Sequence, residues 1–156
     1  MIEYENRPFS DVESMNQGLI NNWNNKVKEN DEIYVLGDLM FGNGILANEI
    51  LKQLKGTKYL ILGNHDYFVK NKTFNQNLFK WIKDYHVIKE NGNKIILFHY
   101  PIQRWDCCHH GSYHLYGHIH SNELRYPMKN AYNVGVDVND YEPKTLEELI
   151  NKKEKK

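Results

Sequence analysis

The chain has 156 residues, of which 40% are hydrophobic, and its 20 basic side chains balance 20 acidic ones. This length allows one domain with its own core, and the balanced charge excludes a strong overall field for nucleic acid or anionic membranes, although a local basic groove stays open. The apolar runs are too short for a membrane span, and the N-terminal segment "MIEYENRPF" has no apolar core of a signal peptide, so we expect a cytoplasmic protein.

The first half of the chain alternates between helical and extended patterns. A capping-box pattern at Ser10–Glu13 precedes a helix that we predict over roughly residues 11–28. A short β-rich run at 32–38 ends in Gly37-Asp38, and a helix is predicted around 45–54. A second apolar run follows at 58–66. These alternating patterns predict an α/β domain.

The second half continues this alternation. We predict a short helix at Leu78–Trp81 and a hairpin turn at Asn91-Gly92, before a run that ends at His99. Extended runs at 113–120 and 131–139 follow, and Thr145–Ile150 predicts a final helical turn or two, with a frayed tail after it. No linker or domain boundary interrupts the chain, so residues 1–156 are predicted to form a single domain.

Side chains that can bind metal or transfer protons stand where four of the predicted strands end. They are Asp38, then Asn64, His65 and Asp66, then His99, and finally His118 and His120. In open α/β sheets, ligands bind in the crevice beyond the carboxyl ends of the strands, so these side chains are expected to converge. Oxygen and nitrogen ligands without a thiolate suit Mn, Fe or Zn rather than a structural zinc knot.

Two geometric expectations follow for such a metal site. The two oxygens of Asp38 would allow it to bridge two ions. The rings of His118 and His120 would point to opposite faces of an extended strand, so they suit different ions best if the chain bends after Gly117. Two ions about 3.5–4 Å apart can clamp a phosphate group and lower the pKa of a water.

Four motifs in order resemble the calcineurin-like metallophosphoesterase superfamily: "GD" at 37–38, "GNHD" at 63–66, "HYP" at 99–101 and "GHIH" at 117–120. The segments "ENRPF", "GSYHLYGH" and "NVGVDVNDYEPKTLEEL" further resemble its small bacterial and phage-type phosphoesterases. The resemblance implies a layered β-sheet sandwich flanked by helices, and divalent metal ions, two in the complete enzyme. It also implies hydrolysis of phosphomonoesters or phosphodiesters by a metal-activated water. The implied substrate is a small phosphate ester or nucleotide, with nucleic acid only as a substrate and no membrane partner.

The resemblance also implies roles for individual residues. Asp38 would bridge both ions, while Asn64, His99 and His118 would complete one metal site and His120 would serve the other. His65 would face the phosphate, where it stabilises negative charge or protonates the leaving oxygen. Asp66 would orient His65.

One motif of the superfamily is absent. Its members open with a strand that ends in D-x-H, whose Asp and His bind the first metal, whereas this sequence begins with the segment resembling the one just downstream. The chain is therefore expected to lack the first strand of the fold, which would leave neighbouring strands with unpaired edges. Two interpretations are open: a truncated enzyme, or a reduced relative with one metal or none that acts as a silent binding module. We favour truncation, because the other motifs are intact.

The remaining polar residues have weaker signals. Arg104 could grip a phosphate through its bidentate fork or form a surface salt bridge. His114 could contact substrate or serve a buried structural role, and we assign both residues to substrate binding. Residues 107–110, "CCHH", are predicted to form a loop near the cleft, because four consecutive residues cannot wrap one tetrahedral ion. A zinc-dependent nucleic-acid-binding protein is therefore disfavoured.

Overall fold

Two facing sheets organise residues 2–3 and 5–154, the part of the chain that the computed structural model describes. One sheet has the parallel order β1 (Glu32–Val35), β2 (Thr57–Ile61), β3 (Ile82–Lys83). The other has the order β4 (Tyr85–Glu90), β5 (Asn93–Phe98), β6 (Tyr113–Tyr116), β7 (Ala131–Asn133), and only β4 runs antiparallel to its neighbour.

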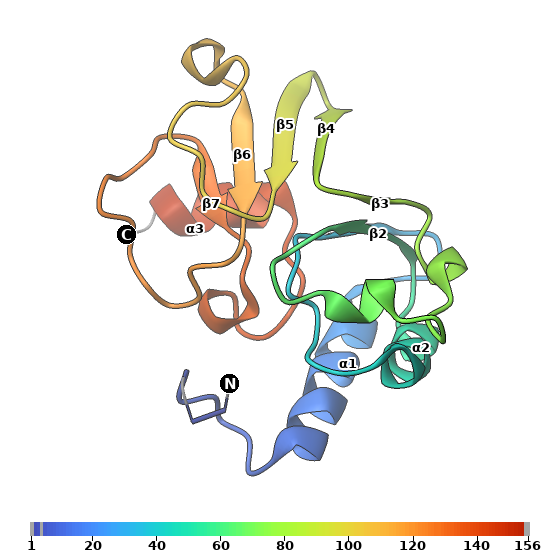
Figure 1. Ribbon diagram of the computed structural model, residues 1–156. Coiled ribbons are helices and arrows are strands. Elements are labelled where there is room, and N and C mark those ends of the chain that lie inside the picture. Colours follow the sequence, from blue (N-terminus) through green and yellow to red (C-terminus); the bar gives the residue numbers. More distant parts are fainter. Residues whose placement is uncertain (1, 4, 155–156) are drawn as a thin grey trace.

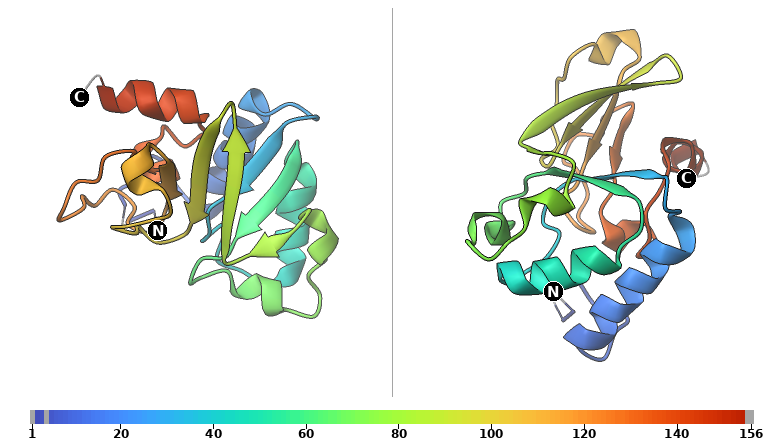
Figure 2. Two further views of the ribbon diagram at one scale, coloured as in Figure 1. Left: turned by 90° about the horizontal axis from the view of Figure 1, so that it is seen from above. Right: turned by 90° about the vertical axis from the view of Figure 1, so that its right-hand side faces the viewer.

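Helices flank these sheets, as Figures 1 and 2 show. Helices α1 (Val12–Lys26) and α2 (Gly44–Gln53) cover the outer face of the first sheet, and α3 (Leu146–Glu154) lies beside the second. Short 3-10 helices occupy the connections: η1 (Tyr67–Lys70), η2 (Gln76–Leu78), η3 (Cys108–His110) and η4 (Val136–Val138). The predicted layered sandwich of sheets flanked by helices is therefore confirmed.

Alternation along the central strands builds the apolar layers of the core. On β2, Leu60 packs with α1 and α2, whereas the next residue, Ile61, packs between the two sheets. On β5, Ile95 and Leu97 face the first sheet, while Ile96 points to the opposite side. Successive side chains of a strand point to opposite faces, so one short strand serves two layers at once.

Several local predictions can be compared with the structure. The hairpin at Asn91-Gly92 is confirmed, with φ values of 49° and 79° that suit a tight two-residue turn. The first helix is confirmed, but its capping box begins one residue later than predicted, because Asp11 accepts from the Ser14 N–H at 2.7 Å. The predicted helix at Leu78–Trp81 is wrong, since only η2 forms before β3 begins. Helix α3 extends to Glu154, so the predicted frayed tail is helical as far as that residue.

Strand β1 lies at the edge of its sheet. Within residues 2–3 and 5–154, β1 pairs with β2 alone. A groove of about 1120 Å³ runs beside this strand, lined mainly by α1, β1, β4, β5 and residues 134–150. Asp38, His118 and His120 also line it, so the open edge and the predicted metal ligands border the same groove.

Replacing Leu51 with Ala should destabilise the domain, because this side chain is fully buried between α2 and β2. Removing a buried leucine costs about 2–5 kcal/mol of unfolding free energy, through lost burial and the cavity left behind. Urea denaturation followed by circular dichroism measures this loss. Ile45→Ala on the same helix, where the side chain is 54% exposed, should change the unfolding free energy by about 0.5 kcal/mol or less. Equal losses in both variants would contradict this assignment of the core.

Candidate metal centre

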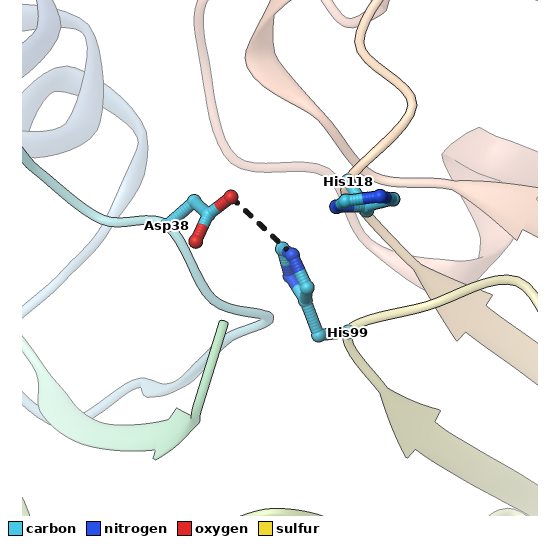
Figure 3. Close-up of side chains that lie close together, drawn as sticks. All are labelled: Asp38, His99 and His118. Atoms are coloured by element: carbon cyan, nitrogen blue, oxygen red, sulfur yellow. Dashed lines mark ion pairs between the residues drawn. The ribbon is translucent and has the colours of Figure 1, made fainter. Parts of the chain in front are cut away.

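Three loops from both sheets bring Asp38, His99 and His118 together, each just after a strand. Asp38 follows β1, His99 follows β5 and His118 follows β6. One ligand atom from each residue lies within 4.8 Å of the others. Figure 3 shows the three side chains converging from separate segments of the chain, with the ion pair between Asp38 and His99 marked. This grouping is what the strand-end pattern predicts.

The backbone is unusual at several of the predicted ligands. Asp38, His118 and His120 have φ values of 53°, 67° and 50°, in the left-handed region that non-glycine residues rarely adopt. Such conformations cost free energy and cluster at functional sites. Strand β6 ends at Tyr116, so the extended run predicted to reach residue 120 is too long, and His118 and His120 lie in a loop, the condition under which their rings suit different ions.

The hydrogen bonds of His99 show how this cluster favours a positive charge. The ring is fully buried, and its Nδ1 lies 2.7 Å from the carbonyl oxygen of Leu36, which can only accept, so Nδ1 carries a proton. In a neutral ring Nε2 then has a lone pair, yet it faces Asn64 Oδ1 at 3.1 Å and Asp38 Oδ2 at 3.3 Å. His99 Nε2 thus faces two oxygen acceptors, an arrangement that a metal ion among these three atoms would satisfy.

These residues fit a divalent metal ion. The set combines a carboxylate, an amide oxygen and imidazole nitrogens, which suits Mn, Fe or Zn. His99 donates its Nδ1 proton to a backbone carbonyl, the usual outer contact of a ligating histidine, and this contact fixes the tautomer that presents Nε2. Burial and the neighbouring His99 lower the pKa of His118, which favours the neutral ring that a metal ion needs. The identity and number of the ions stay predictions.

Asp66 holds the loops that follow β1 and β2. Its carboxylate accepts from the backbone N–H groups of Asp38 at 3.0 Å, Leu39 at 2.9 Å and Gly63 at 2.8 Å. Burial raises the pKa of this carboxyl, although the three donors oppose the rise. In the described part of the chain the carboxylate contacts no side-chain donor. The predicted partnership with the His65 ring is therefore corrected: Asp66 positions Asp38 through the backbone.

His65 lies beside the metal cluster and among aromatic rings. Its backbone N–H donates to Asp38 Oδ1 at 2.7 Å, so the loop after β2 is tied to the predicted bridging ligand. Its ring centroid lies 5.0 Å from that of Phe41 and 6.2 Å from that of Tyr67. The predicted contact of His65 with a phosphate stays a prediction.

A second group of candidate ligands contains His120 with Glu5 and Asp137. His120 Nδ1 lies 3.0 Å from Asp137 Oδ2, and Arg7 donates to both Asp137 oxygens, from Nε at 2.7 Å and from Nη2 at 3.0 Å. Burial raises the pKa of Asp137, but hydrogen bonds and charge from Arg7 and His120 outweigh it and hold the pKa below its usual range. The structure thus places His120 in a different group from Asp38, His99 and His118. Sequence reasoning missed Glu5, Arg7 and Asp137, although they lie in the quoted segments "ENRPF" and "NVGVDVN".

His114 and Arg104 do not match the predicted substrate contacts. His114 is fully buried and bonded to the backbone of Ile96, Tyr100 and Ile102, so its structural alternative holds. Arg104 is exposed and directly precedes Trp105 and Asp106, and Asp106 contacts Lys94 at the start of β5. That is the end of the strand opposite His99, so the position of Arg104 does not support a phosphate contact.

The segment 107–110 also lies away from the metal centre. It contains η3 and directly precedes β6, whereas His118 follows the other end of that strand, and Figure 1 shows the two ends apart. The segment connects two strands as predicted, but residues 108–110 form a 3-10 helix rather than an irregular loop, and the expected place near the cleft is wrong. In the described residues, neither cysteine belongs to a candidate metal group. No helix within residues 2–3 and 5–154 is long and apolar enough to cross a membrane.

Comparisons with known proteins agree with this geometry. The family model of calcineurin-like phosphoesterases matches residues 8–153. An uncharacterized protein from Methanocaldococcus jannaschii is 38% identical over 162 aligned positions, which cover 99% of this chain and 84% of that protein. The crystal structure of a protein of unknown function from Aquifex aeolicus superposes with a TM-score of 0.71 at 26% identity, covering 97% of this chain and 90% of the other. The chain therefore belongs to the calcineurin-like phosphoesterase family.

Proposed function

We propose that the protein is a metal-dependent hydrolase of phosphate esters. The observation that carries this proposal is the convergence of Asn64 Oδ1, Asp38 Oδ2 and His99 Nε2 on one point, beside His118. Asp38, Asn64, His99 and His118 would hold one ion, and Asp38 and His120 are proposed to serve a second. When bound, such ions polarise a phosphoryl oxygen and lower the pKa of a water.

The protein's own residues would bind the phosphate and move a proton. His65 is proposed to donate a hydrogen bond to a phosphoryl oxygen or to protonate the leaving oxygen, a role that suits imidazole near neutral pH. The hydrogen bond from the His65 backbone to Asp38 keeps this ring adjacent to the metal cluster. Asp66 would hold the loops after β1 and β2 in fixed positions, because its carboxylate accepts hydrogen bonds from the backbone of both loops.

The alternative is a catalytically silent binding module. It is favoured by the placement of His120, which pairs with Asp137 and does not belong to the group around Asp38. Such a module would retain the ion site of Asp38, Asn64, His99 and His118 and lack the other ion that the reaction needs.

Metal titration and a hydrolysis assay separate these two functions. We expect the purified chain to bind Mn²⁺ in calorimetry, and to hydrolyse bis-p-nitrophenyl phosphate or p-nitrophenyl phosphate once Mn²⁺ is present. Binding without turnover of either ester would support the silent module. An absence of Mn²⁺, Zn²⁺ and Fe²⁺ binding would contradict the hydrolase and would support a silent module that holds no metal.

The rim of the site supports a substrate with an aromatic group, such as a nucleotide diester. Phe41, Tyr67 and Tyr100 are 56%, 66% and 37% exposed. Phe41 and Tyr67 flank His65, while the ring centroid of Tyr100 lies 4.6 Å from that of His118. Exposed aromatic rings beside a phosphate site offer stacking surfaces for bases without selecting a particular base. We therefore propose small phosphodiesters or nucleotides as substrates.

Replacing Phe41 with Ala should raise the KM for thymidine 5′-p-nitrophenyl phosphate by about tenfold, because base stacking contributes about 1–3 kcal/mol. The KM for methyl p-nitrophenyl phosphate, which has the same leaving group but no base, should change less. Steady-state kinetics on both esters measures the difference. Tyr126→Ala removes an equally exposed aromatic ring outside the site and should leave both constants unchanged. A similar rise for both esters in Phe41→Ala would contradict base stacking.

A further inference from the structure

We infer that Arg7 and Asp137 position His120 so that its Nε2 nitrogen is presented to an ion. This inference rests on the proposed metal-dependent function. It assigns a role to two residues that stand 130 positions apart in sequence and meet in space. Their contacts lie behind the ring of His120 and form a chain from guanidinium to carboxylate to imidazole.

The pairing of Arg7 with Asp137 leaves one direction for the hydrogen bond to His120. The side chains of Arg7 and Asp137 are only 10% and 4% exposed, and the guanidinium donates to both carboxylate oxygens. A bidentate pair of this kind forms with an ionised carboxylate, which can only accept hydrogen bonds. His120 Nδ1, at 3.0 Å from Asp137, is therefore the donor and carries a proton. In the neutral ring the lone pair is then on Nε2.

The same N-terminal segment also braces the loop that contains His120. Glu5 Oε2 accepts a hydrogen bond of 2.7 Å from the hydroxyl of Ser121, the residue directly after His120 in the chain. Asn133 donates to the backbone carbonyl of His120 at 2.8 Å. His120 stands in the left-handed region with a φ of 50°, a conformation that needs such support. Ring and backbone are thus held from separate sides, as a ligating histidine requires.

A competing arrangement would make Asp137 itself a ligand, together with Glu5 and His120, whose ligand atoms all lie within 4.8 Å of one another. Arg7 donates to both oxygens of Asp137 and His120 bonds Oδ2 as well, so an ion there would share the carboxylate with the guanidinium, whose positive charge repels it. The two arrangements predict opposite effects when Arg7 is removed. A positioning role predicts weaker ion binding, whereas direct ligation predicts stronger binding because the carboxylate is released.

The first measurement uses the metal-free protein and does not depend on catalysis. Nitrogen-15 NMR of histidine-labelled protein, at alkaline pH where the rings are neutral, reports which ring nitrogen is protonated. His120→Ala identifies the His120 signals by their loss. We expect the Nδ1–H tautomer in the wild type and a shift toward Nε2–H in Asp137→Asn. The matched control Asp140→Asn, at a largely exposed carboxylate, should leave the tautomer unchanged.

The second measurement titrates Mn²⁺ into the full chain and into the variants by calorimetry. The ion that depends on His120 is the one lost in His120→Ala. Its affinity should fall about 10–100-fold in Arg7→Met and Asp137→Asn, the loss typical when the outer partner of a ligating histidine is removed. Arg7→Lys should restore part of it, and Arg125→Met controls for loss of one positive charge. Circular dichroism melting identifies any variant that fails to fold. If Arg7→Met does not fold, the Mn²⁺ affinity of Arg7→Lys is compared with that of the wild type to test the inference.

The outcomes separate this inference from the proposed function. An Nε2–H tautomer in the wild type, a gain of Mn²⁺ affinity in Arg7→Met, or the absence of any ion that depends on His120 would overturn the inference. If the predicted tautomer and the loss of affinity are observed but no phosphate ester is hydrolysed, the proposed function fails and the positioning role stands.

Discussion

Replacing Asp38 with Asn should abolish measurable hydrolysis of bis-p-nitrophenyl phosphate and weaken Mn²⁺ binding by more than about 100-fold, the upper range for losing an outer partner of a ligand. Asp38 supplies the negative charge in the group with His99 and His118. Asn keeps the size of the side chain and can still accept from the His65 N–H, so the loop should keep its conformation. Calorimetry with Mn²⁺ and steady-state kinetics measure the two losses.

The control for this variant is Asp106→Asn. Asp106 is exposed and contacts Lys94 at the start of β5, the end of that strand opposite His99. The Asp106→Asn substitution removes the same charge as Asp38→Asn, and this variant should retain both Mn²⁺ affinity and turnover. If Asp38→Asn bound Mn²⁺ as tightly as the wild type, the group of Asp38, His99 and His118 would not be the metal site. If it bound Mn²⁺ weakly but kept its turnover, the reaction would not depend on this ion.

The convergence of the metal ligands could be predicted because it depends on local signals. Asp38 and His99 each stand immediately after a short apolar run, and His118 follows a run that ends at Gly117. Carboxyl ends of parallel strands meet at one edge of a sheet, which brings His99 and His118 together, and Asp38 joins them from the end of a strand in the facing sheet. The positive φ at His118 was not predicted, because the apolar pattern continues to residue 120 and gives no local signal for the end of β6 at Tyr116.

The contacts behind the ligands could not be predicted, because they join segments that are distant in sequence. Nothing near Arg7 indicates that it meets Asp137, or that Asp137 lies next to His120. The placement of Arg104 could not be predicted for a similar reason: the chain after His99 turns back along the strands, where the Trp105 indole donates a hydrogen bond to the Ser112 hydroxyl. That path depends on burying Trp105 against Ile96, a tertiary contact without a periodic pattern.

Burial explains why His114 does not make the predicted substrate contact. His114 stands on the same strand run as His118 and His120, so its spacing resembles that of a site residue. It faces the apolar layer of Ile96, Trp105 and Tyr116, and its ring nitrogens bond backbone groups there. Burial lowers the pKa of His114, which keeps the ring neutral within that layer. A strand pattern shows which residues share a face but does not show which face the next layer covers.

Replacing Gly63 with Ala should reduce turnover by about 100-fold with a smaller effect on stability, because a 1 Å displacement at a catalytic group can cost about that factor. A Cβ at this position would collide with the Asp38 Oδ1 oxygen and lie 2.5 Å from the Asp38 backbone nitrogen. The loops after β1 and β2 therefore approach so closely that any side chain here must displace the predicted bridging ligand. Steady-state kinetics, Mn²⁺ calorimetry and urea denaturation on the same preparation measure the three effects.

Gly42→Ala is the matched control, because a Cβ there would meet only the ends of the Leu46 and Met40 side chains, at 3.0 Å. Flexible side chains can move by a few tenths of an ångström, so this variant should keep both Mn²⁺ affinity and turnover. Backbone and a hydrogen-bonded carboxylate cannot yield in this way at Gly63. If Gly63→Ala lost stability but kept its Mn²⁺ affinity and turnover, the close approach of these loops would serve folding alone. Loss of turnover and affinity, with an unfolding free energy near that of Gly42→Ala, would show that the approach sets the position of Asp38.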